Sequence, residues 1–331
     1  MKIINRIIVA VLLLLNLSCE ETLSPKGKLD DQYVLNCQIA FSKYWDSPST
    51  VTAYLTRVYD VEGLDPEVQT EIPNYTGKVK LIYDNSEYSL TRTYKKNYDP
   101  DVKLPKSKFY INKILRQNTT VKIKAELPNG KILTAQTKLP QYKNFEQNYP
   151  FNSGLTTLID SSVNFMRGRK FEISWKSQLG HSYLGKLNIV YTYTDDEGNK
   201  SMKLKEIPLE YIKTGGKEIA VYPAVDDYSS CVYQFKAIEK ALTELSEGDP
   251  NKERYKIHNL AFSLLEYDSN LSLYYSSTES SADKYSIRTN KSVYSNVEGG
   301  YGIFGSQIVY DYYVKIHYFY VKSFGYEPPD A

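Results

Sequence analysis

The sequence predicts a mostly β protein with two β-sandwich-like domains, and three observations lead to this prediction. Apolar and polar residues alternate with period two over residues 32–139, and the alternation resumes from residue 171. Turn-forming Gly, Pro, Asn and Asp residues separate the alternating runs. The chain also has 32 tyrosines against 11 phenylalanines and 2 tryptophans. Tyrosine suits strands with one buried face, and it is also favoured on binding surfaces.

The first domain is expected over residues 32–140, as a sandwich of immunoglobulin or transthyretin type. Its first strand, which contains Cys37, has an apolar residue at every second position. Further strands are expected over residues 51–59 and 78–83, with a Pro- and Gly-marked stretch over residues 63–77 between them. Several short strands separated by turns are typical of such a sandwich.

The clearest hairpin of this domain turns at residues 128–130, Pro-Asn-Gly. The three-residue loop has Gly at the position that requires a positive φ. This loop length predicts that Ala125 lies opposite Leu133 and that Ile123 lies opposite Ala135, so that the apolar residues share one face.

The second domain is expected over residues 141–331, after a polar linker that begins near Pro140. Alternating runs predict strands over residues 171–175 and 187–193. The acidic stretch over residues 195–199 is expected to form a solvated turn, because it lacks the ligand spacing of a calcium-binding loop. A return strand should follow this turn.

A helix is expected near residues 231–247, because its apolar residues recur at spacings of three and four. These residues are Val232, Phe235, Ile238, Leu242 and Leu245. Residues 260–275 fit a second, weaker helix or a strand. Residues 307–321 are expected to form a long last strand with a bend or bulge, so the domain should be β-rich with one or two helices.

The N-terminus has the pattern of a secretory signal over residues 1–18. A basic stretch precedes an apolar run over residues 7–15, which is too short to span a bilayer as a helix. Ser18 then precedes Cys19, and this pair resembles a bacterial lipoprotein box, although Asn16 stands where that box usually has Leu. We therefore expect Cys19 to become the lipidated N-terminus. The alternative is an ordinary cleaved signal that happens to contain a cysteine.

Residues 19–31 are polar and are expected to form a flexible tether. Glu20 and Glu21 follow Cys19 directly, and acidic residues at this place are similar to the surface-export signal of lipoproteins in the Bacteroidota. This similarity predicts a protein attached through its N-terminal lipid to the outer face of the outer membrane. A lipid anchor of this kind holds a domain near the bilayer without inserting protein into it.

With Cys19 assigned to the lipid, Cys37 and Cys231 remain. Export permits a disulfide between them. Cys37 is nevertheless in phase with the apolar face of its strand, which favours a buried thiol. Cys231 is expected to open the helical segment, and nothing in the sequence brings the two cysteines together.

The charged residues and histidines give no sign of a catalytic, metal or nucleic-acid site. The 41 basic and 39 acidic residues leave a net charge of +2, and no basic run looks like a nucleic-acid patch. His181, His258 and His317 are isolated, and the last of them is expected within the final strand. We therefore expect no metal, no cofactor and no catalytic residue.

Residues 300–305, Gly-Tyr-Gly-Ile-Phe-Gly, match the dinucleotide-binding pattern G-x-G-x-x-G. That motif needs a strand before it and a helix after it, whereas a strand is expected to follow here. A nucleotide site is therefore rejected. The glycines fit a tight bend or close chain packing, so the segment is a candidate interaction or packing element. Its candidate residues are Asn296, Gly299, Gly300, Tyr301, Gly302, Phe304 and Gly305.

Residues 294–305 resemble the closing signature of an uncharacterised lipoprotein family of the Bacteroidota, domain of unknown function 4249. Residues 18–21, the first strand and the hairpin end at residues 137–140 are similar to that family as well. The chain departs from the family in its high tyrosine content and in a polar insertion around residues 276–284. The resemblance implies an outer-membrane lipoprotein with β-sandwich domains, commonly encoded beside TonB-dependent transporters. It supplies no catalytic residues.

Three functions follow from these expectations. The favoured one is a non-catalytic surface lipoprotein that binds a ligand or partner and assists a TonB-dependent transporter in nutrient uptake. The alternative is a structural or adhesion protein of the envelope without a soluble ligand. The least favoured is a hydrolase, which would need an acid or serine cluster gathered in a cleft.

Overall fold

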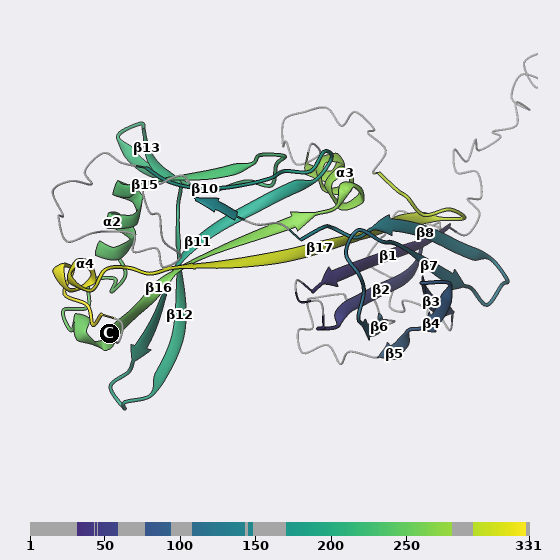
Figure 1. The fold of residues 1–331 in the computed structure, drawn as a ribbon, viewed down its shortest axis with the longest axis horizontal. Coiled ribbons are helices and arrows are strands. Elements are labelled where there is room, and N and C mark those ends of the chain that lie inside the picture. The colour runs from purple at the N-terminus through teal and green to yellow at the C-terminus, as the bar shows by residue number, and fades with distance from the viewer. Residues whose placement is uncertain are drawn as a thin grey trace, which may run out of the picture.

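The computed structural model is mostly β, as predicted, with three α-helices among its described residues (Figure 1). It describes residues 32–42, 44, 46–58, 77–93, 108–142, 145–147, 170–279 and 294–328. The predicted signal over residues 1–18, the lipidated Cys19 and the tether over residues 19–31 lie outside this part of the chain. No helix in the described part is long and apolar enough to cross a membrane.

The largest sheet has eight strands and extends through both ends of the molecule. In spatial order they are β12 (Lys200–Ile207), β11 (Ser182–Thr194), β16 (Tyr255–Tyr267), β17 (Tyr301–Val314), β1 (Gln32–Phe41), β2 (Ser49–Val58), β6 (Lys108–Lys113) and β5 (Thr91–Thr93). The β1–β17 pair is parallel, and the other neighbouring pairs are antiparallel.

A four-stranded sheet packs on the β17-β1-β2-β6 part of the large sheet, and we call this unit the N-terminal sandwich. Its strands are β4 (Ser86–Ser89), β3 (Lys78–Tyr83), β7 (Thr120–Glu126) and β8 (Ile132–Lys138). Both sheets turn alternate side chains inward, so the core is largely aliphatic. Fully buried members of this core are Leu35, Ile39, Val51, Leu81, Val121, Ile123 and Leu133.

The predicted β7–β8 hairpin is confirmed. Ala125 pairs with Leu133 and Ile123 pairs with Ala135, as the loop length indicates. Gly130 has a φ of +82°, the left-handed conformation for which glycine is favoured. The acidic turn before β12 also forms, with Oδ1 of Asp195 accepting hydrogen bonds from backbone N–H groups within residues 197–199.

The rest of the described chain forms the C-terminal region, in which one face of the β12-β11-β16-β17 sheet is covered by smaller elements. These are the sheet of β15 (Ser230–Gln234), β10 (Lys170–Trp175) and β9 (Phe145–Gln147), the hairpin of β13 (Glu210–Thr214) and β14 (Lys217–Val221), and the helix α2 (Phe235–Thr243). The Trp175 ring lies 5.7 Å from the Tyr183 ring and 6.2 Å from the Phe262 ring, measured between centroids. These contacts place the small sheet against the large one, so this core is rich in aromatic rings.

The helix predicted near residues 231–247 begins later than expected. Residues Ser230–Gln234 form β15, and α2 covers only Phe235–Thr243. Cys231 therefore lies in a strand and does not open a helix. The prediction that the apolar residues share one face of the helix holds for Phe235, Ile238 and Leu242, which are buried. The helical spacing could not reveal the short strand before it, because pairing with β10 fixes the backbone of residues 230–234.

The last strand is also shifted relative to the prediction. β17 begins at Tyr301 and ends at Val314, and the chain then enters a third helix, α4 (Tyr318–Ser323). His317 therefore does not lie in the last strand. It precedes α4, where Nδ1 accepts a hydrogen bond from the Phe319 N–H group. Tyr320 and Val321 are consecutive buried residues, a pattern that suits a helix face and not a strand.

β17 joins the two parts of the molecule. Its first half pairs in parallel with β1, from Tyr301 to Ile308. Its second half pairs with β16, from Gln307 to Val314. Figure 1 shows this yellow strand running from the N-terminal sandwich into the C-terminal region. The domain division predicted at residue 140 assigns β17 to the second domain alone, whereas its first half completes a sheet of the N-terminal sandwich.

Candidate functional site

The glycine-rich segment connects the two sheets of the N-terminal sandwich. Thr134 of β8 and Glu298 exchange two backbone hydrogen bonds, of 3.1 and 2.8 Å. From there the chain crosses to β1 and continues as β17. Because a strand and not a helix follows the glycines, the segment lacks the helix N-terminus that a dinucleotide site needs.

The glycines of this segment lie against neighbouring backbone. A Cβ atom at Gly302 would lie 2.1 Å from the carbonyl oxygen of Leu35, and Gly302 has a φ of +123°. Gly299 has a φ of +79°, and its Cβ would lie 2.4 Å from the carbonyl oxygen of Ile132. Gly300 approaches β1 in the same way. The segment is therefore a packing element, and an interaction role for it stays a prediction.

Two asparagine side chains hold this segment in place. Oδ1 of Asn296 accepts a hydrogen bond from the Phe304 N–H group, and Nδ2 donates to the Phe304 carbonyl, both at 2.8 Å. Asn296 thus takes the place of a neighbouring strand at Phe304. Asn270 donates both to the same carbonyl and to that of Gln136 on β8. Tyr301, by contrast, is 55% exposed.

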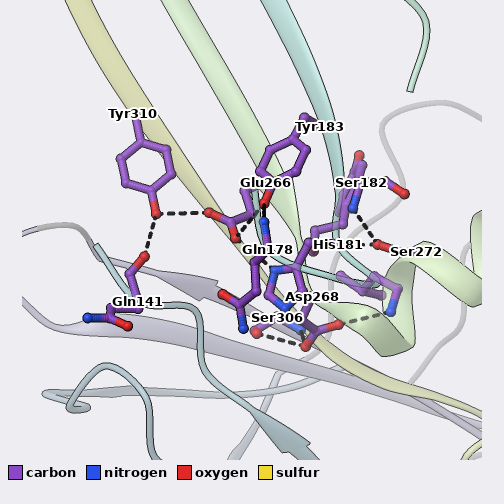
Figure 2. Close-up of polar contacts among 12 residues, drawn as sticks. Gln141, Gln178, His181, Ser182, Tyr183, Glu266, Asp268, Ser272, Ser306 and Tyr310 are labelled. Atoms are coloured by element: carbon purple, nitrogen blue, oxygen red, sulfur yellow. Dashed lines mark hydrogen bonds and ion pairs between the residues drawn. The ribbon is translucent and has the colours of Figure 1, made fainter. Parts of the chain in front are cut away.

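Asp268 is a buried carboxylate at the junction of the two parts (Figure 2). It lies directly after β16 and is only 1% exposed. Its Oδ2 accepts hydrogen bonds from the Thr137 and Ser306 hydroxyls, at 2.5 and 2.8 Å, and from the Ser306 N–H group. Its Oδ1 accepts from the Leu271 N–H group at 2.9 Å. Burial raises the pKa of the Asp268 carboxyl, while these hydrogen bonds act in the opposite direction.

Glu266 is a second buried carboxylate, two residues earlier on β16. Its Oε1 lies 2.7 Å from Nδ1 of His181, and its Oε2 lies 3.0 Å from the Tyr310 hydroxyl. The Tyr183 hydroxyl lies 3.4 Å from Oε1 (Figure 2). Burial, together with the Glu266 charge, raises the pKa of Tyr183 and of Tyr310.

This carboxylate cluster is a structural junction. Glu266 has no exposed surface and His181 is 5% exposed. The Tyr310 hydroxyl also lies 3.1 Å from the carbonyl oxygen of Gln141, which ties β17 to the end of the N-terminal sandwich. Among the described residues that line the two hollows introduced below, neither Glu266 nor Asp268 occurs. Because both acids are buried and hydrogen-bonded, the cluster fixes the strands against one another.

An open hollow of about 390 Å³ lies between the outer face of the N-terminal part of the large sheet and the helix α3 (Ser269–Glu279). We call it the α3 hollow. It is lined by Asn36, Cys37, Gln38, Thr52, Tyr54, Lys108, Leu271, Tyr274, Tyr275 and Ile303. Its volume falls within the range of about 300–1,000 Å³ that is usual for small-molecule sites.

The strand register builds the floor of the α3 hollow. One row of residues crosses four neighbouring strands: Ile303 on β17, Asn36 on β1, Tyr54 on β2 and Lys108 on β6. The next row contains Gly305, Gln38 and Thr52. A Cβ atom at Gly305 would lie 2.5 Å from Cγ of Leu271, so this glycine lets α3 pack close to the sheet as one wall.

Three polar side chains of the α3 hollow are free to meet a ligand. Among the described residues, the side chains of Asn36, Gln38 and Lys108 make no hydrogen bond or ion pair with protein groups, and all three are partly exposed. Tyr274 and Tyr275 stand on the helical wall, with ring centroids 5.6 Å apart. No sequence pattern indicates this site, because Asn36 and Gln38 look like ordinary outward residues of an alternating strand.

A second hollow, of about 440 Å³, lies against β7, β8 and the glycine-rich segment. It is lined by Ile82, Lys122, Ile123, Thr134, Ala135, Gln136, Asn270, Asn296 and Glu298. The amide groups of Asn296 and Asn270 are already bonded to backbone groups there. This hollow thus contains the predicted candidate Asn296, but its asparagines serve the packing of the chain.

His258, Cys37 and Cys231, which were also singled out in the sequence, do not come together in one site. Nε2 of His258 lies 2.7 Å from Oγ1 of Thr192 on the neighbouring strand. Cys37 and Cys231 are both buried free thiols, and burial raises the pKa of Cys231 to about 11. Within the described part of the chain, no three His, Cys, Asp or Glu residues gather in a way that could hold a metal ion.

No family model matches this chain, and no curated protein matches it either. The resemblance to the lipoprotein family of unknown function is therefore a prediction that rests on the sequence segments quoted above.

Proposed function

We propose that this protein is a lipid-anchored protein of the outer membrane, exposed at the cell surface, that binds a ligand in the α3 hollow. In this proposal it does not catalyse a reaction and assists a TonB-dependent transporter in nutrient uptake. The observation that carries the proposal is the α3 hollow itself. It combines amide, hydroxyl and aromatic side chains, and among the described residues the side chains of Asn36, Gln38 and Lys108 make no hydrogen bond or ion pair.

The N-terminal sequence supports the membrane attachment. Ser18 and Cys19 follow a signal-like stretch, and the polar residues 19–31 precede β1. Thirteen extended residues reach at most about 45 Å, so such a tether would keep the folded body close to the bilayer. The transporter as partner comes from the resemblance alone.

The structural or adhesion alternative is supported by a different surface. Met202 and Leu204 on β12, and Val309 and Tyr313 on β17, are exposed by 73%, 63%, 42% and 63%. The strand register places these side chains on the face of the large sheet opposite to its aromatic core. A face with such apolar residues suits contact with another macromolecule of the envelope.

Fractionation of cells that produce the Cys19→Ala variant tests the attachment. We expect the parent protein to sediment with outer membranes and the variant to remain soluble, because lipidation requires the Cys19 thiol. Protease added to intact cells should cleave the parent protein. Membrane association of the variant equal to that of the parent would contradict the proposal.

Affinity purification from solubilised outer membranes separates the favoured function from the alternative. A stoichiometric transporter in the eluate supports the accessory role. Its absence, together with self-association or binding to cell-wall material, supports the structural alternative.

A further inference from the structure

The charge of the α3 hollow limits the kind of ligand it can hold. Among the described residues that line it there is no Asp or Glu, and Lys108 is the one cationic side chain. A cationic ligand would therefore find no counter-charge there, whereas a neutral ligand, or one with a single negative group, would fit. A nucleotide is disfavoured because one lysine offers too little positive charge for several phosphate groups.

The hydrogen-bonding groups are spread along the floor of the hollow. Asn36 and Gln38 are two residues apart on β1 and point to the same face, about 6.6 Å apart along the strand. Thr52 lies directly beside Gln38 on β2. Each amide both donates and accepts, and a hydroxyl does the same. A ligand that satisfies this floor must carry several donor–acceptor groups along its length.

One aromatic ring belongs to this floor, and two more stand at its side. Tyr54 lies beside Asn36, and Tyr274 and Tyr275 form part of the wall. The negative face of an aromatic ring attracts polarised C–H groups, and the phenol hydroxyl adds a hydrogen bond at its edge. A lipid is disfavoured because seven of the ten described lining side chains carry amide, hydroxyl or ammonium groups. An extended peptide is disfavoured because β1 and β2 are inner strands with both edges paired.

From these observations we infer that the ligand of the α3 hollow is a short oligosaccharide. This inference rests on the proposed ligand-binding function and gives that function a substrate class. Ring hydroxyls would bond to Asn36, Gln38 and Thr52, and the C–H face of a sugar ring would pack on a tyrosine. Lys108 stands where it can bond to a hydroxyl or to the carboxylate of an acidic sugar.

The test uses the full lipidated chain, purified in detergent, on an array of neutral and acidic oligosaccharides, followed by calorimetry with the sugars that bind. Gln38→Leu replaces the amide side chain with a slightly shorter apolar one, and Tyr54→Leu removes a ring. We expect each change to weaken binding about tenfold or more. Thr50→Val is the matched control, because Thr50 lies on β2 outside the lining and is exposed. It should leave the affinity unchanged.

Hydrogen exchange of the unaltered protein gives a second measurement that does not depend on a variant. The bound sugar should slow exchange in peptides from β1, β2 and α3, and leave β13 and β14 unchanged. If only acidic sugars bind and Lys108→Gln removes their binding, the ligand is an acidic oligosaccharide, which also supports the inference.

Two results would overturn the inference. One is a folded protein that binds no member of the array, and the other is sugar binding that neither Gln38→Leu nor Tyr54→Leu weakens. Parallel arrays of peptides and of lipid vesicles show whether the protein binds a ligand of another class. They therefore separate failure of this inference from failure of the proposed ligand-binding function. A peptide whose binding is weakened by the same two variants would leave a ligand-binding protein with another substrate class. Fractionation of Cys19→Ala tests the membrane attachment independently of either result.

Discussion

The N-terminal sandwich and the C-terminal region bury the inner faces of their sheets with different kinds of side chain. The sandwich has an aliphatic core of residues such as Leu35 and Ile123, which need no hydrogen-bond partner. The C-terminal core is built around rings such as Tyr183 and Tyr310, whose hydroxyls must find partners inside. The buried carboxylate of Glu266 supplies such a partner.

The two parts also differ in how they are completed. The C-terminal sheet obtains β11 and β12 from one local turn, whereas the N-terminal sheet obtains its last inner strand, β17, from the far end of the described chain. The close approach of β17 to β1 depends on glycine, and its continuation into the other part is held by Asp268. The N-terminal sandwich is therefore complete only when β17 has been added.

The largest effect is expected for Gly302→Ala. The new Cβ would collide with the carbonyl oxygen of Leu35, and the φ of +123° would be strained for alanine. We expect a loss of about 4 kcal/mol or more, or failure to fold, measured by urea denaturation. Gly130→Ala is the control, because Gly130 also has a positive φ but has no atom within 4 Å of the added Cβ. It should cost only about 1 kcal/mol. Equal costs for the two changes would show that β17 does not pack tightly on β1.

The second largest loss of stability is expected for Asp268→Asn. In either orientation of the amide, its NH₂ group would face a backbone N–H group, that of Leu271 or that of Ser306. We expect a loss of about 3 kcal/mol in the free energy of unfolding, because a buried N–H group then lacks its acceptor. Asp227→Asn, at an exposed position, should change it by less than about 0.5 kcal/mol. An unchanged stability of Asp268→Asn would remove the junction role of this carboxylate.

A moderate effect is expected for Tyr310→Phe. The change keeps the ring in the C-terminal core and removes the hydroxyl that lies between Glu266 and Gln141. We expect a loss of about 2 kcal/mol, because the buried carboxylate loses a hydrogen bond. The same change at Tyr313, which is 63% exposed, should be nearly neutral in thermal unfolding. A neutral Tyr310→Phe would show that the hydroxyl partners are dispensable in this core.

The smallest effect is a pH effect at Tyr255. Burial, followed by the hydrogen bond with Asp249, raises the pKa of Tyr255 from 10.0 to about 12. A pKa raised in the folded state gives a stabilisation that is present below pH 10 and lost as the pH rises through 12. Parent and Tyr255→Phe should therefore converge in stability by about 1 kcal/mol between pH 9 and pH 11. A constant difference over this range would show that the phenol ionises normally in the folded protein.

The local elements of this fold were predictable, because their signals lie within a few residues. The alternation of apolar and polar residues predicted β3 over residues 78–83, and the loop length predicted the pairing of Ala125 with Leu133. β15 and α4 were not predictable, because a five-residue strand and a six-residue helix are too short for periodicity to separate them from their neighbours.

The long-range features could not be predicted for a different reason. The parallel pairing of Gly302 with Leu35 depends on the arrangement of the whole chain, and alternation does not say which strand is the neighbour. The α3 hollow depends on the same pairing, because Ile303 joins Asn36 and Tyr54 in one row only when β17 lies beside β1. The glycines did predict close packing, which is what their positions against Leu35 and Ile132 require.

Hydrogen exchange in increasing urea tests most directly whether β17 makes the two parts one cooperative unit. Mass spectrometry would follow peptides from β7 and β8 in the N-terminal sandwich and from β11 and β16 in the C-terminal region. We predict that all four lose protection at the same urea concentration, and that Gly302→Ala makes the β7 and β8 peptides exchange first. If the two parts of the parent protein lose protection at clearly different concentrations, they fold independently and the shared strand does not couple them.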